Sequence, residues 1–106
     1  MDVERGAINR LVVPARELET HYLLEFVCPS DAFTTRYCVT TNEGLESGPL
    51  LLVFTETDSP TAINGEVSLP PSDWSLTVYG QNSSSNMDAS AASRTVHTEL
   101  IRVNHG

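Results

Sequence analysis

Segments with strand composition recur along this chain, and no segment between them has the length or periodicity of a stable helix. The strand candidates lie about 10 to 15 residues apart with Gly, Pro, Asn and Asp between them, which is typical of an antiparallel sandwich or barrel. A chain of 106 residues is long enough for one two-layer core and too short for a second domain. We therefore predict an all-β fold, an antiparallel β-sandwich of seven or eight strands, Ig-like or jelly-roll-like, with residues 1–106 as a single domain.

The strand candidates are short runs rich in β-branched, aromatic and aliphatic residues. They cover residues 8–13, 21–28, 34–41, 50–56, 63–69, 74–79 and 95–103. The runs 21–28 and 34–41 are predicted to form a hairpin, because turn-forming residues lie between them. Residues 1–7 are expected to be an N-terminal arm and residues 104–106 a C-terminal tail.

Alternation along these runs indicates which side chains face the core, since successive residues of a strand point to opposite faces. In the run 21–28, every second residue from Tyr22 onward is apolar, and Trp74 begins a similar series in the run 74–79. The predicted core residues are Tyr22, Leu24, Phe26, Val53, Val67, Trp74, Leu76 and Val78.

The strand that begins at Trp74 continues into a Ser/Asn tract, WSLTVYGQNSSSN, that cannot extend a packed strand. The side chains opposite Trp74 form a polar, aromatic face suited to contact with another subunit. The predicted contact residues are Arg10, Thr77, Tyr79, Gln81, Asn82 and Asn86. A plain surface loop is the alternative, and a Ca²⁺ site built from loop oxygens is a further one. A sugar-stacking platform of Trp74 and Tyr79 is disfavoured, because the two rings lie on opposite faces.

The charge balance limits the classes of partner. Six arginines and no lysines stand against 14 acidic residues, for a net charge of −8. A surface this acidic repels phosphate backbones, so nucleic acid is not an expected partner. The sequence has no basic segment leading into an apolar run and no apolar run long enough for a membrane helix. We expect a soluble protein made in a cytoplasm, without membrane contact.

Two cysteines flank the predicted hairpin turn in the segment CPSDAFTTRYC. Directly opposed positions on antiparallel strands can approach disulfide geometry, so a bond between Cys28 and Cys38 is an open alternative. Cytoplasmic synthesis favours free thiols instead. Two cysteines without nearby partners fall short of a zinc site.

No residue constellation in the chain spells out a reaction. His21, His97 and His105 are far apart, and no nucleophile motif such as GxSxG accompanies them. Acidic residues are plentiful, but glycosidase chemistry needs two of them facing across a sugar-sized cleft. The sequence therefore predicts no enzyme, no catalytic residue, no cofactor and no metal.

Several segments together resemble a group of small β-sandwich virion proteins of tailed bacteriophages, from phages of Bacteroidetes and related marine and crAss-like gut phages. The similar segments are INRLVV, HYLLEFV, PTAINGEVSLPPSDW and WSLTVYGQNSSSN, followed by ELIRV, so the resemblance runs from Ile8 to Val103. Gly80 departs from the W-x-x-x-VYEQ-x-S-x-N pattern, which has Glu at that position.

The resemblance implies a non-enzymatic structural component of a virion, at the head, neck or tail, made in the host bacterial cytoplasm. Its implied partners are capsid, portal, neck or tail subunits and further copies of itself. We expect contacts through strand edges, the N-terminal arm and the loop 82–93. An Ig-like module that binds a glycan or host receptor through its loops is the alternative.

Overall fold

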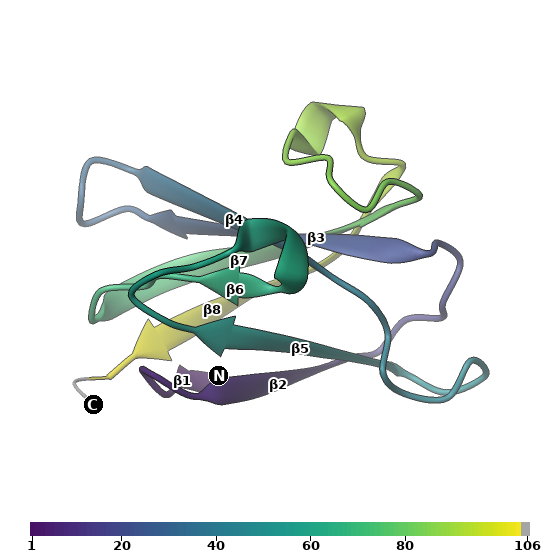
Figure 1. The fold of residues 1–106 in the computed structure, drawn as a ribbon, viewed down its shortest axis with the longest axis horizontal. Helices are drawn as coiled ribbons and strands as arrows, with labels where there is room; N and C mark the ends of the chain where they lie inside the picture. The colour runs from purple at the N-terminus through teal and green to yellow at the C-terminus, as the bar shows by residue number, and fades with distance from the viewer. Residues whose placement is uncertain (105–106) are drawn as a thin grey trace.

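The computed structural model describes residues 1–104 and places eight strands in two packed sheets (Figure 1). The strands are β1 (Asp2–Val3), β2 (Ile8–Val13), β3 (His21–Cys28), β4 (Thr34–Thr40), β5 (Leu50–Glu56), β6 (Glu66–Val67), β7 (Ser72–Gln81) and β8 (Arg94–Val103). Two 3-10 turns, η1 (Ala62–Asn64) and η2 (Ala89–Ala91), interrupt the connections. The predicted all-β sandwich is confirmed, with eight strands.

One sheet has five strands in the order β1-β8-β7-β3-β4, and the other has three in the order β2-β5-β6. The long strands pair antiparallel. The two-residue strands β1 and β6 pair in parallel with β8 and β5, so both sheets are mixed rather than purely antiparallel. Each of them is a short strand added at the side of a longer one. Two parallel strands cannot be joined by a hairpin, so the chain has to cross over to reach the parallel partner.

The core lies between the sheets, where alternate side chains of β3 and β7 meet those of β2 and β5. Phe26 of β3 packs edge-on against Phe54 of β5, with ring centroids 5.3 Å apart, and thereby joins the two layers. Trp74 is buried, and its indole N–H donates to the carbonyl of Pro70 at 3.1 Å. Of the predicted core residues, those that are buried are Tyr22, Leu24, Phe26, Val67, Trp74, Leu76 and Val78.

Val53 is not a core residue, contrary to the prediction. β5 buries Leu50, Leu52 and Phe54, so Val53 points to the outer face. The run LLLVF is apolar on both faces, so its pattern cannot show which face turns inward.

The predicted strand 63–69 was also largely wrong. Ile63 lies in η1 and is 54% exposed, and Gly65 ends that turn with a φ of 72°. A left-handed residue is the usual end of a helical turn, and here it leaves only Glu66–Val67 as strand.

Residues 1–7 are not a free arm. Asp2–Val3 forms β1 beside the end of β8, and the side chain of Val3 is completely buried. The apolar side chain at position 3 therefore draws this segment into the core. Of the predicted tail, Asn104 donates its N–H to the carbonyl of Val3 at 3.4 Å, and residues 105–106 lie outside the described residues.

Gly80 is required where β7 passes beneath Glu19. A Cβ atom at this position would meet the Glu19 carboxylate at 2.2 Å. Glu19 cannot easily move away, because Arg94 donates Nε to one carboxylate oxygen at 2.7 Å and Nη2 to the other at 3.0 Å. The glutamate that the phage pattern has at position 80 would not fit beside this ion pair.

Replacing Gly80 by Ala should destabilise the protein by about 1–3 kcal/mol, because the new methyl group displaces Glu19 from Arg94. Gly48→Ala is the control, since its Cβ would meet nothing closer than 3.6 Å and should be neutral or slightly stabilising. Denaturant unfolding measures both. In a Glu19→Ala background the cost of Gly80→Ala should fall, and strictly additive free energies would contradict the proposed clash.

Cys28 and Cys38 are free and buried, and they are not opposed. Cys28 pairs with Thr34, and Cys38 pairs with Leu24, which lies four residues before Cys28 on β3. Four residues of strand span about 13 Å, well beyond the reach of a disulfide. The hairpin turn is centred on Asp31, two residues earlier than opposed cysteines would need. A disulfide between them is therefore excluded in this fold.

The two thiols should differ in reactivity. Burial raises the pKa of the Cys38 thiol to about 12. Burial also acts on Cys28, but hydrogen bonds from Ser30 and Ser72 and from nearby backbone groups outweigh it, and the Cys28 pKa lies below its ordinary value.

Iodoacetamide should therefore alkylate Cys28 before Cys38 in the native protein, because the thiolate is the reactive form. Peptide mass spectrometry measures the order, and both thiols should react at similar rates after unfolding. Cys28→Ser should leave a native protein that resists alkylation. Faster labelling of Cys38 than of Cys28 would contradict the burial of Cys38.

Candidate assembly surfaces

β2 is an open edge of the three-stranded sheet (Figure 1). The carbonyl of Ala7 accepts a hydrogen bond from the N–H of Glu56 at 3.0 Å. This bond shows which residues of β2 point their main-chain N–H and C=O groups toward β5. Main-chain direction alternates along an antiparallel strand, so every second residue of β2 turns its N–H and C=O to the solvent. These residues are Ile8, Arg10 and Val12. An unpaired edge of this length is a template for another strand.

The outer face of the same sheet is largely apolar. Ile8 is 57% exposed and Val12 is 62% exposed, with Arg10 between them. Val53 lies across from Arg10, and Leu51 lies across from Val12, both half-buried. We call these five residues the β2 surface. Its single charged side chain, Arg10, makes no ion pair within residues 1–104.

β8 provides a second, less regular edge. β1 covers only its end, where the N–H of Arg102 donates to the carbonyl of Met1 at 2.9 Å. By alternation, the main-chain groups of Thr98 also point away from β7. The β7–β8 register shifts beside Tyr79, which leaves a bulge in β8. Bulges bend an edge away from regular pairing, so β2 is the better template.

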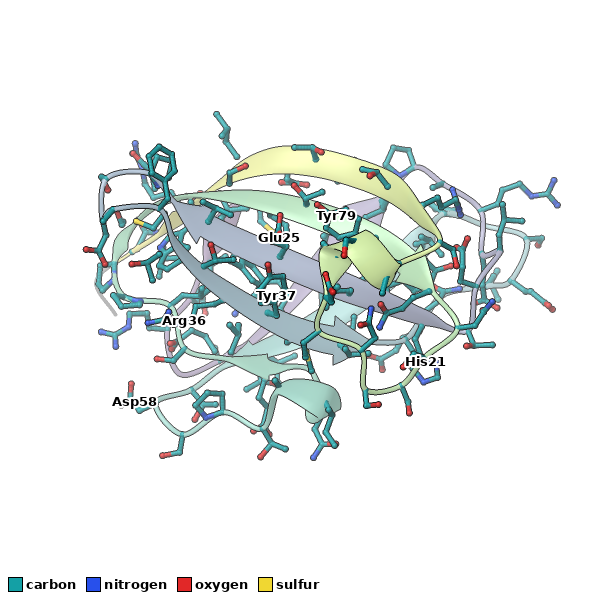
Figure 2. All side chains as sticks on the ribbon, turned by 90° about the horizontal axis from the view of Figure 1, so that it is seen from above. His21, Glu25, Arg36, Tyr37, Asp58 and Tyr79 are labelled. Carbon is teal, nitrogen blue, oxygen red and sulfur yellow. The ribbon has the colours of Figure 1, made fainter. Side chains whose placement is uncertain are left out.

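On the opposite side of the molecule, the outer face of the five-stranded sheet carries Glu25 between two tyrosines (Figure 2). The hydroxyl of Tyr37 on β4 donates to Glu25 Oε2 at 2.9 Å, and that of Tyr79 on β7 donates to Oε1 at 3.2 Å. We call these three residues the tyrosine patch. Beside it, the segment 82–93 stands over this face (Figures 1 and 2). Leu23 and Val39 lie on the same face by strand register and are buried.

Glu25 also changes the acidity of both tyrosines. Burial raises the pKa of Tyr37 above its ordinary value of 10.0, and the hydrogen bond and charge of Glu25 raise it further. Burial is again the largest cause for Tyr79, followed by the charge of Glu25 and its hydrogen bond. A phenol that donates to a carboxylate loses this hydrogen bond when it ionises, so both tyrosines stay neutral to higher pH.

In Glu25→Gln, the pKa values of Tyr37 and Tyr79 should fall but stay above 10.0, because burial remains. The ultraviolet absorbance of tyrosinate measures the change, with Tyr37→Phe and Tyr79→Phe to assign it. Raised folded-state values stabilise the protein below the unfolded pKa of about 10, and this contribution is lost as the pH rises through the folded values. Wild-type stability should therefore fall more steeply above about pH 10 than that of Glu25→Gln. Identical titrations would contradict the contact.

The segment after β7 is held by its own hydrogen bonds. Gln81, predicted as a contact residue, is only 2% exposed, and its amide donates to the carbonyls of Ser83 and Asn86, both at 3.0 Å. The Asn86 amide donates to Gln81 Oε1 at 2.8 Å. Asn82 accepts the N–H of Thr20 at 3.1 Å. The loop covers Gln81. The amides of Gln81 and Asn86 are used in hydrogen bonds that hold the loop, so they are not free to bind a partner.

The structure separates the other predicted contact residues. Arg10 lies on the β2 surface, whereas Thr77 and Tyr79 lie on the outer face of the five-stranded sheet. Sequence reasoning missed Glu25, Tyr37 and the exposed apolar neighbours of Arg10. Alternation in HYLLEFVC already turns Glu25 outward, but its meeting with Tyr37 and Tyr79 depends on strand register.

Each described histidine contacts a side chain close to it in the sequence. His21 Nδ1 lies 2.9 Å from the hydroxyl of Thr20, and His97 Nε2 lies 2.9 Å from Glu99 Oε1. His105 lies outside the described residues. Among residues 1–104, no three His, Cys, Asp or Glu side chains gather as a metal-binding group. No helix in the same range is long and apolar enough to cross a membrane.

The hollows on the surface are open. One of about 380 Å³ lies beside the end of β8 and includes Trp74, Leu100 and Ile101 in its lining. Another, of about 320 Å³, lies between β4 and β5 and includes Val39, Thr40 and Val53. The second hollow also includes His21, Glu43 and Ser84 in its lining, and among residues 1–104 the hydrogen-bond partner of His21 is Thr20 rather than a hydroxyl of this lining.

Comparisons with known proteins gave no match. No family model matches the chain, no curated protein matches it, and no solved structure matches it.

Proposed function

We propose that this chain is a non-enzymatic assembly component that joins further copies of itself and neighbouring proteins through the β2 surface. The observation that carries the proposal is the unpaired edge of β2 beside an exposed apolar face. Such an edge contributes main-chain hydrogen bonds to an added strand, and its side chains supply specificity.

The energetics favour a contact at this position. Complete burial of an exposed Ile or Val side chain contributes about 1.5–3 kcal/mol. Ile8 and Val12 lie on the same face of β2, so one partner can cover both. The net charge of −8 opposes close approach of copies at low salt, which makes an apolar contact with few acidic groups the favourable place to meet.

The resemblance to small β-sandwich proteins of tailed phages supports a virion as the assembly. In this proposal the protein is made in the bacterial host and takes its place at the head, neck or tail in multiple copies. Its partners are then capsid, portal, neck or tail subunits as well as itself.

Val12→Lys should weaken self-association at least tenfold, because a buried ammonium group replaces an apolar contact. Light scattering after size-exclusion chromatography, over a range of concentrations, measures the association. Phe33→Lys is the matched control, since Phe33 is 70% exposed in the turn that joins β3 and β4 of the five-stranded sheet.

Mass spectrometry of purified phage particles tests the location independently, with several copies per particle as the expected result. A wild-type protein that stays monomeric at all concentrations and is missing from particles would refute the proposed function.

A further inference from the structure

Glu25 is a carboxylate without a cation. It lies in the middle of β3, half-buried, and none of the ion pairs among residues 1–104 includes it. The hydroxyls of Tyr37 and Tyr79 each donate to one of its oxygens. An ionised carboxylate can accept about four hydrogen bonds, so both oxygens keep room for another donor.

A guanidinium group fits this position better than a neutral or anionic group. Its planar donors match the two oxygens of a carboxylate, and its face is attracted to aromatic rings such as those of Tyr37 and Tyr79. Asp88 acts on Tyr37 as well and raises its pKa, so the potential around the patch is negative. The tyrosine patch therefore has the chemistry of an arginine-binding site.

Arg10 is the arginine that complements it. Arg5, Arg94 and Arg102 are paired with carboxylates of their own. Arg16 and Arg36 make no ion pair among residues 1–104, but Arg16 lies in the connection after β2, and Arg36 lies on β4 in the same sheet as the tyrosine patch. Arg10 stands free at the centre of the β2 surface, surrounded by apolar side chains. One surface thus offers a cation among apolar groups, and the other offers an anion between aromatic rings.

Within one molecule these two surfaces cannot meet, because they lie on the outer faces of opposite sheets. In Figure 1, β2 lies at the bottom of the molecule, and the segment that stands over the five-stranded sheet lies at the top. Glu25 is on β3 of the five-stranded sheet, close to Tyr37 and Tyr79 (Figure 2).

We propose that Arg10 of one copy binds Glu25, between Tyr37 and Tyr79, of the next copy. The contact is head-to-tail, since each copy presents two different surfaces, and repetition gives a closed ring or an open row. This inference rests on the proposed function and names the surface that receives the side chains of the β2 surface. β3 is paired on both sides, so the main-chain edge of β2 stays free for a strand of a neighbouring protein.

Charge exchange tests the contact. Arg10→Glu and Glu25→Arg should each weaken self-association roughly tenfold or more, because each places like charges at the interface. An equal mixture of the two variants should associate about as well as wild type, since the alternating copies restore opposite charges at every contact. The double variant should recover alone. Sedimentation velocity measures all four samples.

Matched controls separate this contact from general charge effects. Arg16→Glu and Glu46→Arg make the same changes in net charge at exposed positions and should leave association within about threefold of wild type. Circular dichroism checks folding. If Glu25→Arg fails to fold, Glu25→Gln keeps an oxygen for one tyrosine hydroxyl, offers an N–H to the other, and should still weaken association.

Several outcomes would overturn the inference. Wild-type association of Glu25→Arg would do so, as would single variants that weaken association without recovery in the mixture. Binding of a glycan at the patch, lost in Tyr79→Ala while self-association stays intact, would assign the patch to a sugar instead. Each of these results leaves assembly through β2 standing. A wild type that stays monomeric would refute this inference, and one that is also missing from particles would refute the proposed function as well.

Discussion

Packing of β3 and β7 against β5 is the interaction on which the remaining structure depends. Phe26 and Trp74 stand in the apolar face of the five-stranded sheet, and Phe54 meets Phe26 from the other sheet. Because side chains alternate along a strand, burial of this face also turns Glu25 and Tyr79 outward. The core therefore fixes which polar groups can meet a partner.

Polar contacts at the periphery determine which parts of the outer surface remain accessible. The ion pair of Glu19 with Arg94 holds the connection before β3 against the start of β8, beside the end of β7. The amides of Gln81 and Asn86 close the segment after β7 on itself. With this segment fixed, one end of the outer face of the five-stranded sheet is covered, and the tyrosine patch beside it is accessible.

The net negative charge of the chain makes the charges of the two proposed surfaces important for association. Fourteen acidic residues keep copies apart in general, so association needs a place where repulsion is low and attraction is specific. The β2 surface has one cation and no acid, and the tyrosine patch has an anion without a cation. Apolar burial would supply affinity at such a contact, and the charge pair would set its register.

The sequence by itself determined the fold class, most strands and the core faces of β3 and β7, because period-two alternation records which side is buried. It did not determine the inward face of β5, since LLLVF is apolar on both sides. Tertiary structure alone decided that Gln81 is covered and that the two cysteines are separated, because turn position and register set both. The tyrosine patch has the same origin, as its members come from three strands that only the sheet brings together.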